Sequence, residues 1–203
     1  MPRFALVLAL FGYLALFVIR SIIQWRQTGS TGIKGFHGAI GSTPWFAGVL
    51  VSLGFLLAPL APGAALLGWP GGSIQVASGW LHVAGAGFVL IGIAGGLVAQ
   101  LTMGDSWRIG VDESDRTKLV TGGLFARVRN PIFSFMGLSM LGILWMVPNV
   151  WALAACAISL AGIELQVRAV EEPYLLRAHG DAYVRYAARV GRFAPGIGRR
   201  AAH

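Results

Sequence analysis

The sequence predicts an all-α integral membrane protein with five transmembrane helices, a C-terminal helical hairpin and amphipathic cytoplasmic tail helices. Composition is the first reason: 56% of the 203 residues are hydrophobic and only 12% are charged, whereas about a quarter of the residues in a typical soluble domain are charged. The distribution of charge is the second reason. No Asp, Glu, Lys or Arg occurs between Lys34 and Asp105, or between Arg129 and Glu164. Soluble helices need a polar face, so these two spans argue against a soluble fold.

The first three helices are predicted from the lengths of the apolar runs and from the Pro and Gly residues that interrupt them. Crossing a bilayer takes roughly 20 mostly apolar residues, with a range of about 17–25. Residues 4–23 meet this length, and we expect a retained helix because no small-residue cleavage site of a signal peptide follows the apolar run. The uncharged block 35–104 is too long for one helix. Pro and Gly residues near its middle divide it into helices at 44–61 and 77–101.

The second uncharged block, residues 130–163, predicts a tight hairpin of two helices. The Val-Pro-Asn step at 147–149 divides the block, because proline removes a backbone donor and clashes with the preceding turn. The two helices are therefore expected at 131–147 and 150–168. Each is close to the minimum spanning length, so local thinning of the bilayer or burial against neighbouring helices is expected.

Positive charge predicts the orientation of these helices. Among the Lys and Arg residues, only Arg3 belongs to the side that holds the N-terminus. The others follow the first, third and fifth helices: Arg20, Arg26, Lys34, Arg108, Arg116, Lys118, Arg127, Arg129 and the arginines from Arg168 onward. Because positive loops stay in the cytoplasm, we expect the N-terminus outside and the C-terminus cytoplasmic. The Ala-, Gly- and Arg-rich composition is typical of a GC-rich bacterial genome and indicates a bacterial plasma membrane.

The net charge of +8 follows from this topology. Positive loops attract anionic lipid, so membrane lipids are expected partners. A nucleic-acid site would need a basic groove with aromatic platforms, and no nucleic-acid partner is expected. The sequence does not predict an oligomeric state. We divide the chain into residues 1–75, which hold the first two helices, and residues 76–203, which hold the other helices, the loop 102–131 and the tail.

Two short segments of the second part carry the candidate chemistry. The first, TGGLFARVRNPIF, puts Arg127 and Arg129 at the mouth of an apolar helix. The second, EEPYLLRAHGDAYVRYAARVGRFAP, begins with Glu171 and Glu172 at the membrane boundary. A doubled carboxylate there is costly unless it is partnered. The alternatives are arginines that extend to lipid headgroups and an ordinary solvated Glu-Glu turn.

Several neighbouring residues have both a structural and a functional interpretation. Glu164 and Arg168 stand four residues apart, which favours an ion pair on a helix surface. Trp107 and Arg108 are expected to anchor their loop at the interface or to form part of a lid. The tail arginines Arg185, Arg189 and Arg192 are expected at lipid headgroups. Asp112, Glu113 and Asp115 come without His or Cys and predict a solvated cluster, so no metal site is expected.

The two segments, with the hairpin between them, resemble the integral-membrane isoprenylcysteine carboxyl methyltransferases and the related membrane phospholipid methyltransferases. The family pattern is G-P-[YF]-x-x-x-R-H-P-x-Y, then E-E-x-x-L-x-x-x-[FY]-G-x-x-Y-x-x-Y and a terminal proline. The corresponding residues within 100–198 are Gly122, Gly123, Phe125, Arg129, Asn130, Pro131, Phe133, Glu171, Glu172, Leu175, Gly180, Tyr183, Tyr186 and Pro195. Asn130 replaces the family histidine and can form hydrogen bonds but cannot titrate. Phe133 replaces a tyrosine and lacks its hydroxyl.

The resemblance implies an enzyme that moves a methyl group from S-adenosylmethionine to a lipophilic, membrane-embedded acceptor, with S-adenosylhomocysteine as product. It implies a cofactor pocket on the cytoplasmic side and an acceptor that enters laterally from the bilayer. The cofactor-binding residues that it implies are Gly123, Leu124, Phe125, Arg129, Asn130, Pro131, Glu171, Glu172 and Tyr183. The catalytic residues that it implies are Arg129, Arg168 and Glu171. Methyl transfer from a sulfonium depends on alignment and exclusion of water more than on an acid or a base.

Each candidate side chain has an expected partner under this resemblance. Arg129 would meet the methionine carboxylate of the cofactor or the acidic residues that frame it. Glu171 or Glu172 would face the cofactor's amino group or ribose hydroxyls, and Arg168 would hold an acidic acceptor. Two alternatives stay open: an NADPH-dependent membrane reductase of the sterol-reductase type, and a non-catalytic relic of the fold, for which Asn130 is the best support.

Overall fold

The structure is a computed structural model that describes residues 1–33, 35, 38–71, 74, 79–110 and 118–200. Within these ranges it consists of helices, turns and isolated bridges, with no β-strand, so the all-α prediction is confirmed. The first helix is continuous and has three parts: α1 (Pro2–Tyr13), a π-helical stretch (Leu14–Ile19) and α2 (Arg20–Thr28). The other helices of the bundle are α3 (Thr43–Leu67), α4 (Gly79–Met103), α5 (Pro131–Met146) and α6 (Val150–Leu165).

The C-terminal part continues directly from α6. A π-helical stretch, Gln166–Glu171, leads into α7 (Glu172–His179), and α8 (Asp181–Arg189) follows. Gly180 ends α7 with a φ of 48°, a conformation that favours glycine. Two short 3-10 helices, Gly104–Ser106 and Gly123–Ala126, lie in the segment between α4 and α5.

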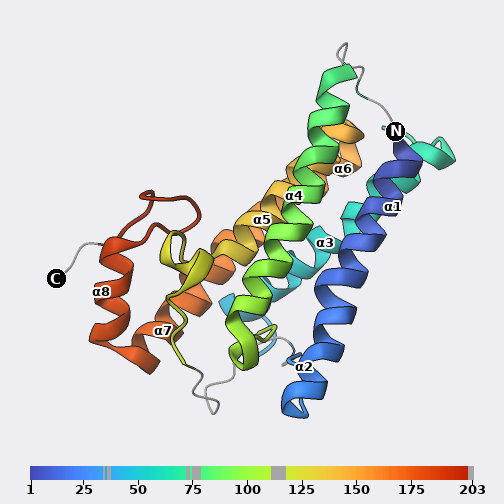
Figure 1. The fold of residues 1–203 in the computed structure, drawn as a ribbon. Helices are drawn as coiled ribbons and strands as arrows, with labels where there is room; N and C mark the ends of the chain where they lie inside the picture. Colours follow the sequence, from blue (N-terminus) through green and yellow to red (C-terminus); the bar gives the residue numbers. More distant parts are fainter. Residues whose placement is uncertain (34, 36–37, 72–73, 75–78, 111–117, 201–203) are drawn as a thin grey trace.

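Successive long helices run in alternating directions, with α4 beside α5 and α3 beside α6 (Figure 1). The helices α2, α7 and α8 lie toward one end of the bundle, and the N-terminus lies at the other (Figure 1). The positive charges that follow the first and last helices therefore gather at one end, as the loop pattern predicts. Which end faces the cytoplasm stays a prediction.

Glycines allow the paired helices to touch through their backbones. A Cβ atom on Gly85 of α4 would lie 2.7 Å from the carbonyl oxygen of Gly142 in α5, and one on Gly142 would lie 2.6 Å from that of Gly85. On the other side of the bundle, a Cβ on Gly162 of α6 would lie 2.6 Å from the backbone nitrogen of Val51 in α3. Small residues at such crossings are the usual means of packing helices in membranes.

Four helices of the described chain are long and apolar enough to span a membrane: Pro2–Thr28, Thr43–Leu67, Gly79–Ser106 and Val150–His179. The prediction of an integral membrane protein fits this finding. The exact count of five is not confirmed, because α5 has only 16 residues. At 1.5 Å per residue such a helix is about 24 Å long, which is shorter than the hydrocarbon core of about 30 Å.

The end of the second predicted helix was placed wrongly. We expected the helix to stop at residue 61, before Pro62, but α3 continues to Leu67 with both Pro59 and Pro62 inside it. The loss of backbone hydrogen bonds at proline is outweighed here by the close packing of α3 on α6. Gly68, with a φ of 69°, ends the helix instead.

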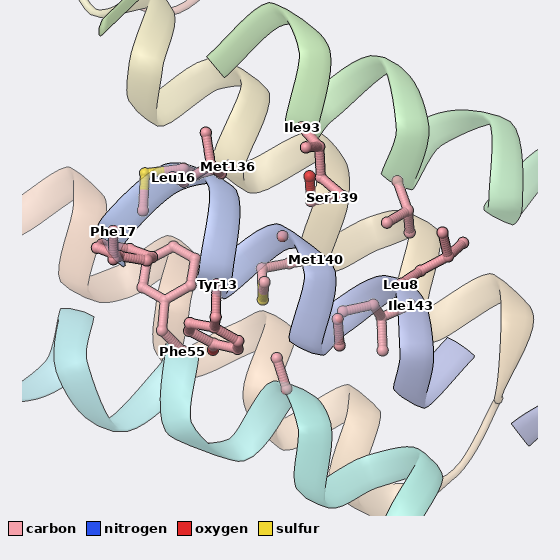
Figure 2. A pocket seen from close by; sticks show the side chains of 14 residues that line it. Leu8, Tyr13, Leu16, Phe17, Phe55, Ile93, Met136, Ser139, Met140 and Ile143 are labelled. Atoms are coloured by element: carbon pink, nitrogen blue, oxygen red, sulfur yellow. The ribbon is translucent and has the colours of Figure 1, made fainter. Parts of the chain in front are cut away.

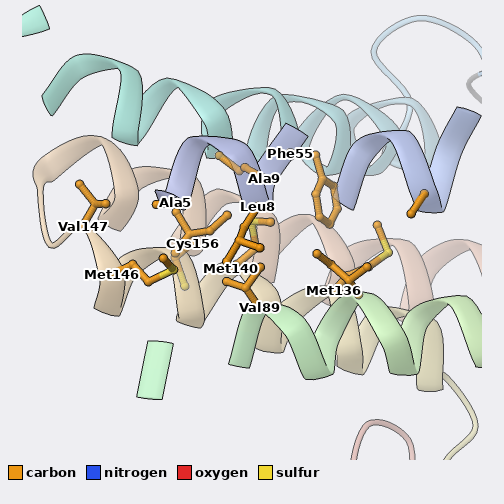
Figure 3. Close-up of a cluster of buried hydrophobic side chains, with 14 of the residues drawn as sticks. Ala5, Leu8, Ala9, Phe55, Val89, Met136, Met140, Met146, Val147 and Cys156 are labelled. Atoms are coloured by element: carbon orange, nitrogen blue, oxygen red, sulfur yellow. The ribbon is translucent and has the colours of Figure 1, made fainter. Parts of the chain in front are cut away.

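The core lies at the centre of the bundle, where α1, α3, α4, α5 and α6 meet (Figure 3). Its buried side chains include Leu8, Phe55, Val89, Met136, Met140, Met146 and Cys156. A cavity of about 30 Å³ lies between α1, α3, α4 and α5 beside this core (Figure 2). A cavity of this size has room for little more than water, so a lipid would fit only if the surrounding side chains moved.

Candidate functional site

The centre of the candidate site is the buried carboxylate of Glu172, at the start of α7. Arg129 Nη2 donates to Glu172 Oε1 over 2.8 Å, and Arg192 Nε donates to the same oxygen over 2.7 Å. Arg192 Nη2 also donates to Glu172 Oε2 over 3.0 Å. One carboxylate therefore bridges two guanidinium groups through charge-assisted hydrogen bonds, which are stronger than neutral ones. These bonds also raise the pKa of Arg192 above its ordinary value.

Arg129 binds the C-terminal tail in addition to Glu172. Its side chain is only 2% exposed. Nη1 donates to the carbonyl oxygens of Ala187 and Val190, over 3.0 and 2.6 Å, and Nη2 also donates to that of Gly198, over 3.1 Å. The carbonyls of Ala187 and Val190 lie at the C-terminal end of α8, where the helix dipole favours a cation. The anion that Arg129 meets is thus a carboxylate of this chain, the second of the two partners that we expected.

Asn130 and the start of α5 hold the same tail through neutral hydrogen bonds. The backbone nitrogens of Arg129 and Asn130 donate to the carbonyl oxygens of Gly191 and Arg192, over 2.8 and 3.1 Å. Asn130 Nδ2 donates to the carbonyl of Arg192 as well, over 3.2 Å. Pro131 occupies the first turn of α5, where its missing N–H costs nothing. The asparagine that replaces the family histidine therefore keeps a structural hydrogen bond.

The two tyrosines of α8 connect this helix to the rest of the site. The hydroxyl of Tyr186 donates to the carbonyl oxygen of Phe125 over 2.7 Å, which ties α8 to the turn Gly123–Ala126. Tyr183 is 1% exposed and lies near Arg129 and Glu172. Burial, with the charge of Glu172, raises the pKa of Tyr183 to about 12, and burial also raises the pKa of Tyr186. Both phenols are therefore neutral near pH 7.

Glu171, the other member of the acidic pair, faces a different set of partners. The residue as a whole is intermediate between buried and exposed, and its carboxylate forms a hydrogen bond with Gln166 and is attracted by the charge of Arg108. The guanidinium of Arg108 lies over the ring of Tyr174, 5.2 Å from its centroid. Glu171 ends the π-helical stretch, and such wide turns are frequent at functional sites. The acidic pair thus divides: two arginines bind the carboxylate of Glu172, whereas the carboxylate of Glu171 faces Gln166 and Arg108.

The structure brings most of the predicted site residues together but separates Arg168 from them. Phe125, Arg129, Asn130, Pro131, Glu172 and Tyr183 form the cluster around the tail, and Glu171 adjoins it. Gly123 and Leu124 belong to the turn that Tyr186 holds. Arg168 is 58% exposed and pairs with Glu164, as its spacing predicted. Arg127 is exposed.

Two expectations for neighbouring residues were wrong. Arg192 does not extend to lipid headgroups, because it is bound to Glu172 and its side chain is only 16% exposed. Trp107 is not an interfacial anchor, because it is 2% exposed. The acidic residues Asp112, Glu113 and Asp115 lie outside the described residues. Among the residues that are described, no group of three His, Cys, Asp or Glu side chains is arranged to hold a metal ion.

Comparison with known proteins identifies the family. A sequence model described as "Phospholipid methyltransferase" matches residues 80–182, which is half of the chain. The chain belongs to the phospholipid methyltransferase family. The family segment runs from α4 into α8 and contains Arg129, Glu171 and Glu172, whereas Arg192 and the N-terminal helices lie outside it. A search of curated proteins finds no match. Membership supports a membrane methyltransferase in general terms.

Proposed function

We propose that this protein transfers a methyl group from S-adenosylmethionine to a lipophilic acceptor in the membrane, at the cytoplasmic end of the bundle. The observation that carries the proposal is the buried ion pair between the two motifs. Arg129 of the first motif and Glu172 of the second are 43 residues apart in the sequence, yet their side chains meet over 2.8 Å. The pair holds the start of α5 and the start of α7 together, beside the partly exposed Glu171.

The residues around Glu171 fit the polar groups of this cofactor. S-adenosylmethionine carries a carboxylate, an ammonium group and two ribose hydroxyls. The carboxylate of Glu171, a residue of intermediate exposure, suits the ammonium group or the hydroxyls. Arg108, which lies near Glu171, suits the carboxylate. We propose that Gly123, Leu124 and Phe125, in the turn that Tyr186 ties to α8, line the same pocket.

The geometry changes the proposed role of Arg129 and Glu172. Both Nη atoms of Arg129 are engaged by Glu172 and by three carbonyl oxygens of the tail. Both oxygens of Glu172 are engaged by arginines. We therefore assign these two residues to positioning, since they hold the walls of the pocket instead of contacting the cofactor. Arg168 lies on an exposed surface with Glu164 and stays a candidate for binding an acidic acceptor.

Among the residues of the central cluster, Asn130, Tyr183 and Tyr186 bind and orient and are not suited to remove a proton near pH 7. S-adenosylmethionine supplies a methyl group on a positively charged sulfur. Asn130 cannot accept a proton, and Tyr183 and Tyr186 stay neutral because burial raises their pKa. An acceptor that is already ionised, such as a carboxylate, needs no base from these residues. Exclusion of water and alignment are then the main contributions of the protein.

Binding of S-adenosylhomocysteine to the detergent-purified protein tests the proposal. At a concentration of 100 times its Kd, a ligand stabilises the folded state by about 2.7 kcal/mol, which thermal unfolding detects. We expect stabilisation by S-adenosylhomocysteine and none by NADPH. Stabilisation by NADPH alone would instead identify a reductase, and stabilisation by neither ligand would identify a non-catalytic relic.

A matched pair of variants locates the binding site. Glu171→Gln removes the carboxylate that we assign to the cofactor, and Glu164→Gln removes an exposed carboxylate less than two helical turns away. We expect the first to weaken binding of S-adenosylhomocysteine by about tenfold, the effect of losing one charge-assisted hydrogen bond, and the second to leave it unchanged. Equal affinities in both variants would remove Glu171 from the site. Transfer of labelled methyl to fractionated membrane lipids would then identify the acceptor.

A further inference from the structure

The N-terminal helix buries an arginine that the proposed function does not use. Arg20, the first residue of α2, has an exposed fraction of 0%. Its Nη2 donates to the carbonyl oxygen of Gly104 over 2.8 Å, and its guanidinium lies over the ring of Trp107, 4.5 Å from the centroid. Nε and Nη1 of Arg20 are buried without a hydrogen-bond partner. Arg20 therefore contacts the short segment that follows α4, at the end of the bundle that holds the candidate site (Figure 1).

Other residues of the N-terminal segment hold the same part of the chain. Gln24, one turn after Arg20, donates from Nε2 to the carbonyl oxygen of Asp105 over 2.9 Å. The backbone nitrogen of Ile109 donates to the carbonyl of Gly32 over 2.7 Å. The segment 104–109 is thus tied to α2 and the turn after it at its beginning, its middle and its end.

The segment 104–109 in turn carries a residue of the candidate site. Arg108 extends from it over the ring of Tyr174 and attracts Glu171. Trp107, the preceding residue, is 2% exposed and lies under Arg20. Two adjacent side chains of one extended segment therefore contact opposite partners: Trp107 contacts the N-terminal helix, and Arg108 contacts the last long helix.

We propose that Arg20 is a positioning residue, which fixes Arg108 against Tyr174 and Glu171 through Trp107 and the Gly104 carbonyl. The inference rests on the proposed function, because it gives Arg108 the carboxylate of S-adenosylmethionine as its ligand. It also gives a role to helices that lie outside the family segment, residues 80–182. The N-terminal helix then completes a site whose other residues all come from the C-terminal half.

The choice of arginine at this position agrees with such a role. Burying a cation costs several kcal/mol, and Arg20 forms no ion pair among the described residues, so its burial is a poor means of gaining stability. A planar guanidinium can stack on an indole ring and donate in its own plane at the same time, which a lysine cannot do. An arginine at this position therefore contributes more to the orientation of Trp107 than to the stability of the bundle.

Hydrogen exchange measures the positioning without any ligand. In the unmodified protein and in the Arg20→Met and Arg26→Met variants, the exchange rate of the Trp107 and Ile109 amides is compared with that of amides in α6. Arg26 is an exposed arginine on the same helix, so its variant is a matched control. We expect Arg20→Met to accelerate exchange in residues 104–109 by at least about tenfold and Arg26→Met by less than about twofold, with α6 unchanged in both. Unchanged exchange in Arg20→Met would overturn the inference.

A double-mutant cycle then tests whether Arg20 acts through Arg108. We expect Arg20→Met to weaken binding of S-adenosylhomocysteine by about tenfold in the otherwise unmodified protein and by less than about twofold in the Arg108→Met background. Equal weakening in both backgrounds would assign Arg20 a separate effect and overturn the inference. If the unmodified protein does not bind S-adenosylhomocysteine, the proposed function fails, and hydrogen exchange alone decides whether Arg20 positions the segment.

A conservative variant covers the case in which Arg20→Met does not fold. Arg20→Lys keeps the charge and a donor for the Gly104 carbonyl but loses the planar group above Trp107. We expect exchange in residues 104–109 and binding of S-adenosylhomocysteine to lie between those of the unmodified protein and Arg20→Met. Arg20→Lys with the affinity and exchange of the unmodified protein would show that stacking on Trp107 is not needed and would overturn the proposed route through Trp107.

Discussion

Two arginines are buried at the same end of the bundle, and each is held by different contacts. Arg129 meets the carboxylate of Glu172 and three backbone carbonyls. Arg20 meets backbone carbonyls and the ring of Trp107, and two of its nitrogens have no hydrogen-bond partner. Each site follows a π-helical stretch, Leu14–Ile19 before Arg20 and Gln166–Glu171 before Glu172.

The two arginines therefore contribute unequally to the stability of the site. Arg129, Glu172 and Arg192 depend on one another. Removal of Glu172 leaves two guanidinium groups without a counter-ion, and removal of either arginine leaves Glu172 with a single partner. Arg20 forms no ion pair among the described residues and is only attracted by the charge of Asp105, so its removal leaves backbone carbonyls without this donor and a cavity. The C-terminal cluster is therefore expected to be a requirement for folding, and the N-terminal contact an adjustment of geometry.

The largest expected effect is that of Glu172→Gln. This variant leaves two buried guanidinium groups without a counter-ion, so the free energy of unfolding should fall by about 3–5 kcal/mol. Thermal unfolding in detergent measures the loss, with Glu164→Gln as an exposed control that should change little. If the two variants were equally stable, the Arg129–Glu172–Arg192 cluster would not be the structural centre of the tail.

The comparison of the two arginines predicts an intermediate effect for Arg20→Met. The variant loses the hydrogen bond to the Gly104 carbonyl, a longer one of 3.5 Å to the Gln100 carbonyl, and the stacking contact with Trp107. The short hydrogen bond and the stacking contact are worth about 1 kcal/mol each, so a loss of about 1–2 kcal/mol is expected. Arg129→Met should lose about 3–5 kcal/mol, because it leaves three carbonyl oxygens of the tail without this donor and removes one charge-assisted hydrogen bond from Glu172. Chemical unfolding of the two variants side by side measures the difference. A larger loss for Arg20→Met would reverse the ranking.

The smallest expected change in stability is that of Arg168→Gln. Exposed ion pairs four residues apart contribute about 0.3–0.5 kcal/mol, so the midpoint of unfolding should hardly move. Measurement of methyl-transfer kinetics distinguishes a role of Arg168 in acceptor binding from a purely structural surface ion pair. If Arg168 holds an acidic acceptor, kcat/KM for the acceptor should fall while the affinity for S-adenosylhomocysteine stays the same. Unchanged kcat/KM would leave Arg168 as a surface residue paired with Glu164.

The sequence predicts the helices of the fold better than their ends. An uncharged block that is divided by one Val-Pro-Asn step predicts the hairpin at 131–147 and 150–168. The structure contains this hairpin as α5 and α6. The end of α3 was missed because local sequence does not show that packing on α6 outweighs two prolines. The division of the chain at residue 75 stays a prediction.

At the candidate site, sequence predicts the acidic pair and Arg129 but not the way in which they share partners. The family pattern contains Glu171 and Glu172 as equals. Only the structure shows that two arginines bind Glu172, whereas Glu171 faces Gln166 and Arg108. Arg192 was missed because it looks like Arg185 and Arg189 in sequence. It differs from them only because the chain turns back after α8 and brings it to Glu172.

The π-helical stretches that precede Arg20 and Glu172 also determine where the chain tolerates a change of length. A π-helical turn bonds residue i to i+5, so it accommodates one residue more than the α-helical turn that it replaces. Deleting a single residue within 14–19 or 166–171 can restore ordinary α spacing and leave everything downstream facing the same way. The same deletion in the middle of α6 would rotate Glu172 about the helix axis by about 100°, away from both of its arginines.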